Sequence, residues 1–322
     1  MQVLRGIESL PGTDRPRVVA VGVFDGVHLG HQAVLARTRE VAEESEAQVA
    51  VTTFEPSPDE FFRPDGPDRR LTLPGEKLEL LAEQGAEMCV VLEFDGEMNQ
   101  WPCERFVKDV YVEGLGARAV VAGESHTFGA GGKGTIDTLA ALGGQSGLHV
   151  ERVPLAQVRG SAISSTEIRR ALRAGEVGRA GEMLGRFYAV EGEVESGAGR
   201  GRRLGFPTAN LAVPERKVVP ADGVYAAYAY VAGERTPAAV NVGGAPTVGQ
   251  PGRTVEAYLI EREVGLEGKR LRVEFVQRLR GEIVFDDTQA LAEQIGRDVA
   301  EIKRMLEAVP ADACQRAPAS TC

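Results

Sequence analysis

The sequence predicts an α/β domain built on a parallel sheet, followed by a small antiparallel β-barrel that a C-terminal helix closes. Up to about residue 184, short runs rich in valine and alanine alternate with amphipathic stretches such as GEKLELLAEQG, the pattern of βαβ units. From residue 185 onward, β-rich runs are separated by Gly and Pro turns with little helix between them. These two patterns indicate two domains of different architecture.

The individual elements follow from the same patterns. The strands of the parallel sheet are predicted at RVVAVGV, AQVAVTTF, MCVVLEF, RAVVAG and LHVERV. The barrel strands are predicted at YAVEGEVESG, GVYAAYAYVAG, TVEAYLIE and KRLRVEFVQRL. The closing helix is predicted from an apolar stripe formed by Leu291, Ile295, Val299, Ile302 and Leu306. We therefore expect domains at 1–184 and 185–308, and a disordered tail at 309–322.

Composition restricts the class of protein. The 322 residues suit two domains, and the 43% hydrophobic content is enough for a core in each. A formal net charge of -10 argues against a nucleic-acid partner, because such partners require clustered Lys and Arg. The sequence contains no signal-peptide pattern and no membrane-spanning run, so we expect a cytoplasmic protein that binds small molecules and no membrane. No feature of the sequence indicates an oligomeric state.

The segment VVAVGVFDGVHLGHQAVLARTRE predicts a strand, a Gly-containing turn and a helix that begins near His28 and His31. Backbone N–H groups at a helix N-terminus attract anions, and two imidazoles one turn apart add donors for phosphate oxygens. Gly30 between them leaves room for a nucleotide. The arrangement favours nucleotidyl transfer over two alternatives, a plain pair of surface histidines and a zinc pair that has no evident third ligand.

The segment ISSTEIR places two hydroxyls and an arginine at the start of a helix. Ser164, Ser165 and Arg169 are suited to hold triphosphate oxygens through charge-assisted hydrogen bonds. The same segment also suits an ordinary helix cap, because Ser165 or Thr166 is followed by Glu167 and an apolar pattern. On the residues alone, the two interpretations carry about equal weight.

The segment RGRRLGFPTANLAVP joins a Gly-rich stretch, from Gly197 to Gly205, to an extended PTAN. Pro207 fixes the backbone, and Thr208 and Asn210 present oxygens two residues apart on one face. Hard oxygen ligands suit Mg²⁺, which keeps several waters and bridges phosphates. A turn followed by an ordinary strand is the alternative for PTAN alone.

These segments resemble one family in order and over almost the whole chain. The first domain resembles the nucleotidyltransferase domain of the bifunctional bacterial riboflavin kinase/FAD synthetases (FMN adenylyltransferases) in GVFDGVHLGHQAVL, TFEPSPDEFF, RRLTLPGEKLELLAEQGAE, LGARAVVAGE and AISSTEIRRALRAGEV. The second domain resembles their kinase domain in RGRRLGFPTANLAVP, GVYAAYA, NVGGAPTVG, TVEAYLIE and GKRLRVEFVQRLRGEIVF. The resemblance implies a Rossmann-like nucleotidyltransferase fold of the HxGH type, followed by the riboflavin kinase barrel.

The resemblance implies phosphorylation of riboflavin to FMN by ATP, then adenylylation of FMN by ATP to FAD with release of pyrophosphate. It implies that Thr208 and Asn210 hold Mg²⁺. It also implies that Glu256 is the base for the ribityl hydroxyl. The alternative for Glu256 is an ordinary glutamate that faces water on an edge strand. His28 and His31 are the implied catalytic residues of adenylyl transfer. The implied ATP contacts are Gly22, Phe24, Asp25, Gly26, Gly30, Ser164, Ser165, Arg169, Gly205, Phe206 and Pro207, and the implied flavin contacts are Pro56, Phe62 and Phe128.

Some positions depart from the family pattern. Ser57 occupies a position where the family usually has a histidine. Ser125 and His126 occupy positions where the family usually has Asp or Asn followed by Phe. Glu267 occupies a position where the family often has an aromatic residue. Shorter hydroxyls lose reach, so a kinase-only protein with weakened adenylyl transfer is an alternative. A non-catalytic flavin-binding regulator is another, although pure binding has less need of a base and metal ligands. The acidic composition disfavours an RNA-linked role for HxGH.

Overall fold

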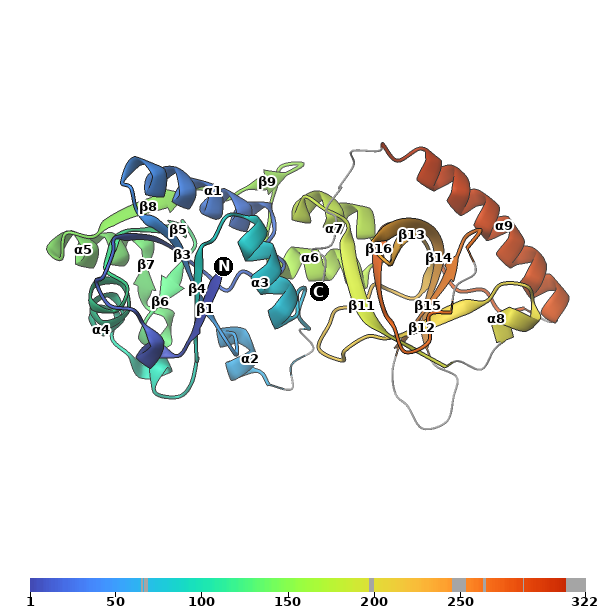
Figure 1. The fold of residues 1–322 in the computed structure, drawn as a ribbon, viewed down its shortest axis with the longest axis horizontal. Coiled ribbons are helices and arrows are strands. Elements are labelled where there is room, and N and C mark those ends of the chain that lie inside the picture. The colour runs from blue at the N-terminus through green and yellow to red at the C-terminus, as the bar shows by residue number, and fades with distance from the viewer. Residues whose placement is uncertain are drawn as a thin grey trace. The chain divides into compact units, whose positions relative to one another are not determined.

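The computed structural model describes residues 1–64, 66, 69–196, 200–244, 253–262, 265–285 and 287–310. The chain divides into two compact units, one of Met1–Asp68 with Thr72–Ser164 and the other of Arg69–Leu71 with Ser165–Cys322 (Figure 1). This division falls earlier than the predicted boundary after residue 184, because helices α6 (Ser165–Arg173) and α7 (Val177–Leu184) group with the second unit. The predicted tail lies outside the described residues from position 311 onward.

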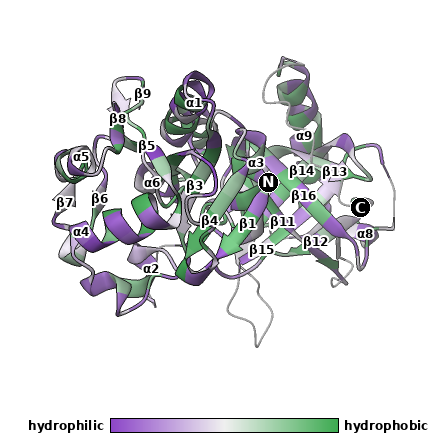
Figure 2. Cartoon of the chain, turned by 60° about the vertical axis from the view of Figure 1, so that its left-hand side comes forward, coloured by the Kyte–Doolittle hydropathy of each residue, from purple (hydrophilic) through white to green (hydrophobic). Residues whose placement is uncertain are grey.

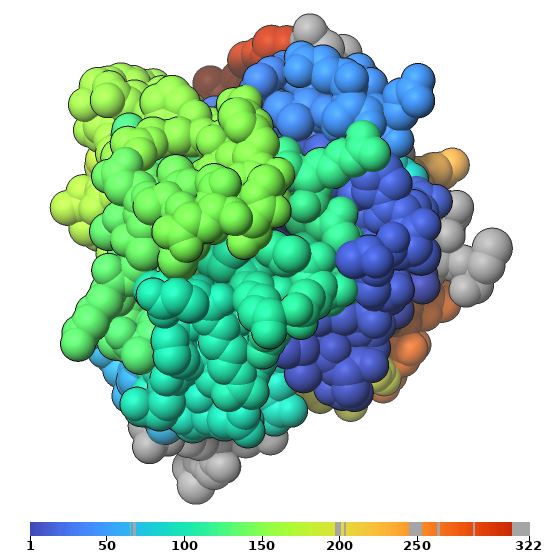
Figure 3. All heavy atoms as spheres, turned by 90° about the vertical axis from the view of Figure 1, so that its left-hand side faces the viewer, coloured from blue at the N-terminus to red at the C-terminus, as the bar shows by residue number. Residues whose placement is uncertain are grey.

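The first unit contains the predicted parallel sheet, with strand order β1-β4-β3-β2-β5-β8. Its edge strand β1 was not predicted from the sequence, because it is short and mostly exposed, and only its pairing with β4 defines it. Figure 3 shows the N-terminal residues at the surface of the molecule. The strands are β1 (Gln2–Arg5), β2 (Arg17–Val21), β3 (Gln48–Phe54), β4 (Met88–Leu92), β5 (Ala117–Gly123) and β8 (His149–Val153).

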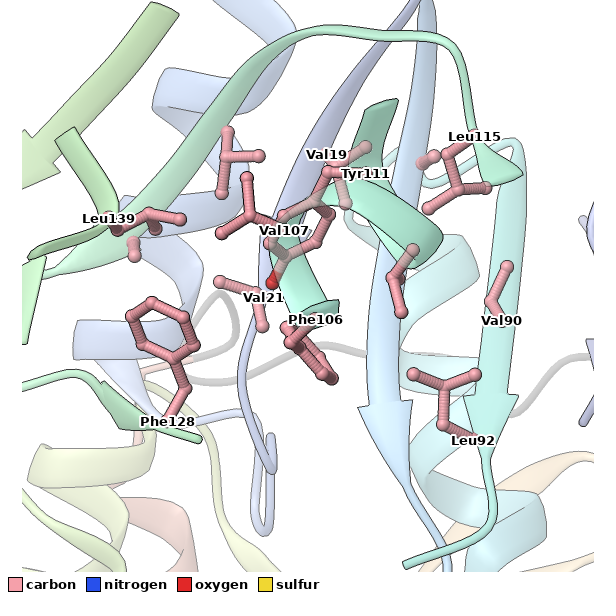
Figure 4. Packing of buried hydrophobic residues seen from close by; sticks show 14 of the residues in the cluster. Val19, Val21, Val90, Leu92, Phe106, Val107, Tyr111, Leu115, Phe128 and Leu139 are labelled. Atoms are coloured by element: carbon pink, nitrogen blue, oxygen red, sulfur yellow. The ribbon is translucent and has the colours of Figure 1, made fainter. Parts of the chain in front are cut away.

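Both faces of this sheet are buried, as is usual for parallel sheets. Successive residues of β2 enter opposite layers, with Val19 and Val21 in one core cluster and Val18 and Ala20 in the other. Figure 4 shows the first cluster, where Tyr111 lies close to β2. Helices α1 (Leu29–Glu44) and α3 (Pro74–Glu83) supply residues to one layer, and α4 (Cys103–Phe106), the π-helical segment η3 (Val107–Gly114) and α5 (Ile136–Gln145) to the other.

Short elements complete the first unit and lie mainly in its loops. Their small size explains why no periodic pattern marked them in the sequence. They are η1 (Ile7–Ser9), α2 (Pro58–Phe62), η2 (Met98–Gln100), β6 (Thr127–Phe128), η4 (Ala130–Gly132), β7 (Gly134–Thr135), β9 (Gln157–Val158) and β10 (Ser161–Ala162).

The second unit contains a closed antiparallel barrel with strand order β11-β12-β15-β14-β13-β16. The sequence patterns found every strand except β12, which was predicted only as an extended segment, and β14, which contains Pro237. Figure 2 shows hydrophobic residues along the barrel strands. The elements are β11 (Tyr188–Glu195), α8 (Arg200–Arg203), β12 (Thr208–Ala212), β13 (Gly223–Val231), β14 (Glu234–Gly244), β15 (Arg253–Leu259), β16 (Arg270–Arg280) and α9 (Thr288–Glu307).

The predicted closing helix is α9, and it is attached to the barrel by apolar packing and one buried ion pair. Ile302 and Leu306 are buried in a cluster with residues of β13. The Arg280 guanidinium of β16 donates to Asp298, with Nε–Oδ2 and Nη2–Oδ2 distances of 3.0 Å and 2.6 Å. Asp298 also accepts from Gln294 at 2.8 Å, so its buried carboxylate is well satisfied.

We expect Asp298→Ala to loosen α9, because the substitution leaves the guanidinium of Arg280 without its carboxylate. Breaking a buried ion pair in this way costs about 3 kcal/mol, or roughly a hundredfold in a local opening equilibrium. Hydrogen–deuterium exchange of peptides covering 288–307 should accelerate by about that factor.

The matched control for this experiment is Glu301→Ala on the same helix. Glu301 pairs with Arg304 at the surface, and such exposed pairs contribute less than about 1 kcal/mol. If the two variants exchanged equally fast, the ion pair would not be what attaches α9 to the barrel.

Candidate functional sites in the two units

Most predicted residues of the first unit follow the carboxyl ends of two neighbouring strands, β2 and β5, whereas Pro56 and Phe62 follow β3. β2 pairs with β3 on one side and with β5 on the other, so strand order reverses at β2. In open α/β sheets the loops diverge at such a switch point, and ligands bind there. The loop after β2 carries the segment from Gly22 to His28, and the loop after β5 carries Ser125, His126 and Phe128.

The turn after β2 is strained, and side chains hold it in place. Phe24 and Val27 have positive φ angles of 55° and 38°, which cost a residue with a side chain about 1–2 kcal/mol. The Asp25 carboxylate accepts hydrogen bonds from the N–H and the hydroxyl of Thr72 at 3.0 Å and 3.2 Å. The Gly26 N–H donates to the same hydroxyl at 3.0 Å. Backbone strain stabilised by its surroundings is typical of functional sites.

His28 and His31 lie together where α1 begins. His28 is the N-cap residue, and its Nδ1 accepts a hydrogen bond from the His31 N–H at 3.3 Å. This acceptor role leaves the proton of a neutral His28 ring on Nε2, which is therefore a donor. The two rings stack 3.6 Å apart, with an interplanar angle of 16°. A Cβ at Gly30 would lie 3.1 Å from His28 Cε1, so the glycine makes room for this ring.

Sequence reasoning missed two polar residues that support the turn, Thr72 and Lys77. Lys77 lies in α3 and is 7% exposed. Its ammonium donates to the hydroxyl of Thr53 at 3.3 Å and to the carbonyls of Val23 and Phe54 at 3.5 Å. It thereby joins the carboxyl ends of β2 and β3. A signal was present in the sequence, because Lys77 falls on the buried face of an amphipathic helix, where a cation is unusual.

Ser57, one of the departures from the family pattern, is the N-cap residue of α2. Its Oγ accepts from the Glu60 N–H at 3.4 Å, and the Glu60 carboxylate accepts from the N–H and Oγ of Ser57, each at 3.0 Å. This capping box satisfies backbone donors at the start of the helix. The hydroxyl therefore fixes the helix that follows Pro56 and carries Phe62.

A continuous series of aromatic contacts joins the predicted flavin residues Phe62 and Phe128. Phe62 is 58% exposed, whereas Phe128 is buried in the core cluster (Figure 4). Neighbouring ring centroids in the series are between 5.8 Å and 6.3 Å apart. In order, the series is Phe62, Phe94, Phe54, Phe106, Phe128 and His126.

His126 ends this series, with its imidazole parallel to the Phe128 ring at an interplanar angle of 7°. Its Nε2 is buried and finds no hydrogen-bond partner in the part of the chain that the structure describes. Burial lowers the pKa of His126 to about 4, so the ring is neutral near pH 7. Ser125 beside it is exposed.

The ISSTEIR residues are divided between the two units. Ser164 ends the first unit, whereas Ser165 begins α6 of the second. Arg169, also in α6, donates from Nε to the carbonyl of Arg69 at 2.9 Å. The predicted contacts of these residues with triphosphate oxygens stay predictions.

In the second unit, Thr208, Asn210 and Glu256 lie on the outer face of the barrel. Asn210 is directly opposite Glu256 in the pairing of β12 with β15, so their side chains project from the same face. The Thr208 hydroxyl is 3.4 Å from Glu256 Oε2. Asn241 of β14, the first residue of the NVGGAPTVG segment, is opposite Glu256 from the other side, and the sequence analysis gave it no role. Because β15 has neighbours on both sides, Glu256 is not an edge-strand residue.

The loop before β12 is tightly folded onto itself. Gly205 has a φ of 84°, and the Phe206 N–H donates to the carbonyl of Gly201 at 2.9 Å. A Cβ at Gly201 would lie 2.3 Å from the carbonyl oxygen of Phe206, so a larger residue would force the loop open. The Phe206 ring contacts Tyr258 edge-on, with centroids 5.4 Å apart, next to Pro207. Residues 197–199 of the Gly-rich stretch lie outside the described residues.

The oxygen donors on the barrel face fit a magnesium ion. A hydroxyl, an amide oxygen and a carboxylate are the hard ligands that Mg²⁺ prefers, and the ion completes its shell with waters and phosphates. Within the described residues, no three or more His, Cys, Asp or Glu side chains gather as a metal-binding group. A magnesium ion here would therefore rely on Thr208 and Asn210, with few protein ligands.

Two protein-family models match the chain, one in the region of the parallel sheet and the other in the region of the barrel. The family model of FAD synthetase matches residues 10–167, and that of riboflavin kinase matches residues 184–306. Together these two matches cover most of the chain, and each covers one of the two sites described above.

Several curated relatives align with the chain over nearly its full length. A bifunctional riboflavin kinase/FMN adenylyltransferase of Pseudomonas fluorescens is 36% identical over 95% of this chain and 98% of its own. The protein of that name from Escherichia coli K12 is 34% identical over 92% and 96%. A solved structure described as a macrolide-efflux protein from Streptococcus pneumoniae is 30% identical, with a TM-score of 0.87 over 94% and 99%. None of the described helices is long and apolar enough to cross a membrane.

The depressed pKa of His126 predicts a pH-dependent stability. The imidazole titrates near pH 6.5 in the unfolded chain and near 4 in the folded protein, so between these values the unfolded state binds more protons. Stability should therefore fall as the pH is lowered from about 6.5 towards 4, and this loss should be smaller in His126→Phe. Tm measured for both proteins across this range checks the prediction, and parallel curves would contradict it.

Proposed function

The chain belongs to the family of bifunctional riboflavin kinase/FMN adenylyltransferases, and on this premise we propose that it converts riboflavin to FMN and FMN to FAD with ATP. The observation that carries the proposal is that both family models match, with relatives aligned from end to end. The substrates are small molecules. The predicted cytoplasmic location and the predicted lack of a nucleic-acid partner stay predictions from composition.

In the kinase reaction, Glu256 orients the terminal ribityl hydroxyl and accepts its proton as the phosphoryl group arrives. Phosphoryl transfer passes through a loose transition state, so positioning contributes more than basicity. The strand register supports this role, because Glu256 is flanked by Asn210 on one side and Asn241 on the other. We propose that the ATP phosphates bind against the backbone of the turn at Gly205 and Phe206, which the positive φ of Gly205 and the hydrogen bond from Phe206 to Gly201 support.

In the adenylyl-transfer reaction, the FMN phosphate attacks the α-phosphorus of ATP in line, and pyrophosphate leaves. Negative charge grows on the phosphate oxygens, and His28 Nε2 together with the N–H groups at the start of α1 stabilises it. His31 holds the His28 ring by stacking and by its N–H bond to Nδ1. Ser164, Ser165 and Arg169 are proposed as further ligands of the triphosphate.

Mg²⁺ neutralises phosphate charge when it is bound. We propose Thr208 and Asn210 as its protein ligands in the kinase domain, which their hydroxyl and amide oxygens on one strand face support. Side chains alternate between the two faces of β12, so Thr208 and Asn210 lie on the same face and can bind one Mg²⁺ ion together.

The kinase-only alternative depends on Ser57, Ser125 and His126. Ser57 has a structural role as a helix cap, and none of the three replaces a group that we assign to phosphate chemistry. We therefore retain both activities in the proposal. The direct test incubates the purified protein with FMN, ATP and Mg²⁺ and measures FAD and pyrophosphate by chromatography. If the protein forms FMN from riboflavin but no FAD from FMN, the kinase-only alternative is correct.

Variants at the two sites should separate the activities. We expect Glu256→Gln to lower riboflavin phosphorylation by at least about a hundredfold and to spare FAD formation from FMN, since it removes the proton acceptor but no phosphate contact of the first unit. His28→Ala should do the reverse, with a loss of about a hundredfold in FAD formation.

Each variant serves as the control for the other. Both reactions are followed in both proteins, with circular dichroism to establish that each is folded. Loss of both activities in either folded variant would contradict two separate sites.

A further inference from the structure

A short segment between α2 and α3, Arg69–Leu71, folds with the second unit, although Thr72, the next residue, belongs to the first. Arg70 is paired in parallel with the loop that follows β12. Its N–H donates to the carbonyl of Arg216 at 2.7 Å, and its carbonyl accepts from the N–H of Val218 at 2.9 Å. The segment is therefore attached to this loop by backbone hydrogen bonds.

The carbonyl of Leu71 accepts a further hydrogen bond, from the Lys217 ammonium at 2.8 Å. Lys217 is 2% exposed, and its Nζ lies 5.2 Å from the centroid of the Tyr188 ring, a cation–π contact. A buried ammonium requires acceptors around it, and its hydrogen bond to a carbonyl is stronger than one between neutral groups. Lys217 therefore fixes the position of the Leu71 carbonyl.

The Thr72 N–H is the other end of the same peptide group, and it is hydrogen-bonded to the turn after β2. It donates to Asp25 Oδ1 at 3.0 Å, and the Thr72 hydroxyl accepts from the Gly26 N–H at 3.0 Å. A peptide bond is planar, so the direction of its C=O fixes the direction of its N–H. One rigid group is thus bonded to a cation at its oxygen and to a carboxylate at its nitrogen, and each of these bonds polarises the other.

We propose that Lys217 is a positioning residue for adenylyl transfer, although it lies in the part of the chain that matches riboflavin kinase. By holding the Leu71 carbonyl it orients Thr72, and Thr72 holds the strained turn that leads to His28 at the start of α1. This role rests on the proposed adenylyltransferase function. A misplacement of about 1 Å in a catalytic group costs up to roughly a hundredfold in rate, so the effect of Lys217 falls on the chemical step.

The competing explanation is that Lys217 only stabilises the loop after β12. Arg253 also stabilises that loop, because its guanidinium donates to the carbonyl of Val219 at 3.1 Å and to the carboxylate of Asp222 at 2.7 Å. In the part of the chain that the structure describes, its hydrogen bonds are to this loop and not to Leu71. Arg253 is therefore the matched control, since its loss loosens the same loop without releasing the Leu71 carbonyl.

The test compares the intact wild-type chain with Lys217→Met, Lys217→Arg and Arg253→Met. Methionine keeps an unbranched apolar stem but has neither charge nor donor, whereas arginine retains both. We expect kcat for FAD formation to fall about tenfold in Lys217→Met, with KM for FMN and ATP within about twofold, and to recover partly in Lys217→Arg. Riboflavin phosphorylation in both Lys217 variants and FAD formation in Arg253→Met should stay within about twofold of the wild type.

An unchanged kcat for FAD formation in Lys217→Met overturns the proposal. Equal losses in Lys217→Met and Lys217→Arg also overturn it, because the cation would then not be what matters. Equal losses in Lys217→Met and Arg253→Met, or a parallel fall in riboflavin phosphorylation, assign the effect to the loop and overturn it too. If Lys217→Met does not fold, Lys217→Gln replaces it, because glutamine is uncharged and too short to reach the same carbonyl.

Hydrogen–deuterium exchange tests the positioning role independently of the adenylyltransferase proposal. If the wild type makes no FAD, that activity is absent whatever Lys217 holds in place. Exchange of peptides covering residues 22–31 is then compared in the wild type, Lys217→Met and Arg253→Met. Exchange about tenfold faster in Lys217→Met alone supports the role, and equal exchange in the wild type and Lys217→Met overturns it.

Discussion

The parallel pairing of β2 with both β3 and β5 is the constraint on which the first unit depends. It buries β2 on both faces and makes the strand order reverse there, so that the loops leaving β2 and β5 diverge. One loop leads to His28, the N-cap residue of α1, and the other to the stacked pair of His126 and Phe128. The histidines predicted to act on phosphate and the predicted flavin contact Phe128 thereby follow adjacent strands.

The turn after β2 also shows how this unit stabilises an unfavourable backbone. Positive φ angles at Phe24 and Val27 are maintained by contacts from outside the turn, notably those of Thr72. Lys77 adds hydrogen bonds at the ends of β2 and β3. The donor groups of the site are therefore held before substrate arrives, which is the condition under which electrostatic stabilisation of a transition state is effective.

The barrel achieves the same preorganisation by different means. Closure gives every strand two neighbours, and register alone decides that Asn210, Glu256 and Asn241 form one row across three strands. A slip of one residue in β15 would turn Glu256 to the interior and dismantle the row. The ion pair between Arg280 and Asp298 fixes the closing helix without taking part in this site.

Local pattern by itself determined the two architectures, the buried parallel strands, the long helix α9 and the place of the HLGH and PTAN motifs, because periodicity and turn residues act within a few positions. Only the tertiary structure decided that β1 is a strand, that Thr72 and Lys77 support the turn, and that Asn241 is beside Glu256. It also showed that Ser57 caps a helix and that His126 Nε2 is buried. These properties depend on pairing register and burial, which arise between residues far apart in the chain and leave no local signature.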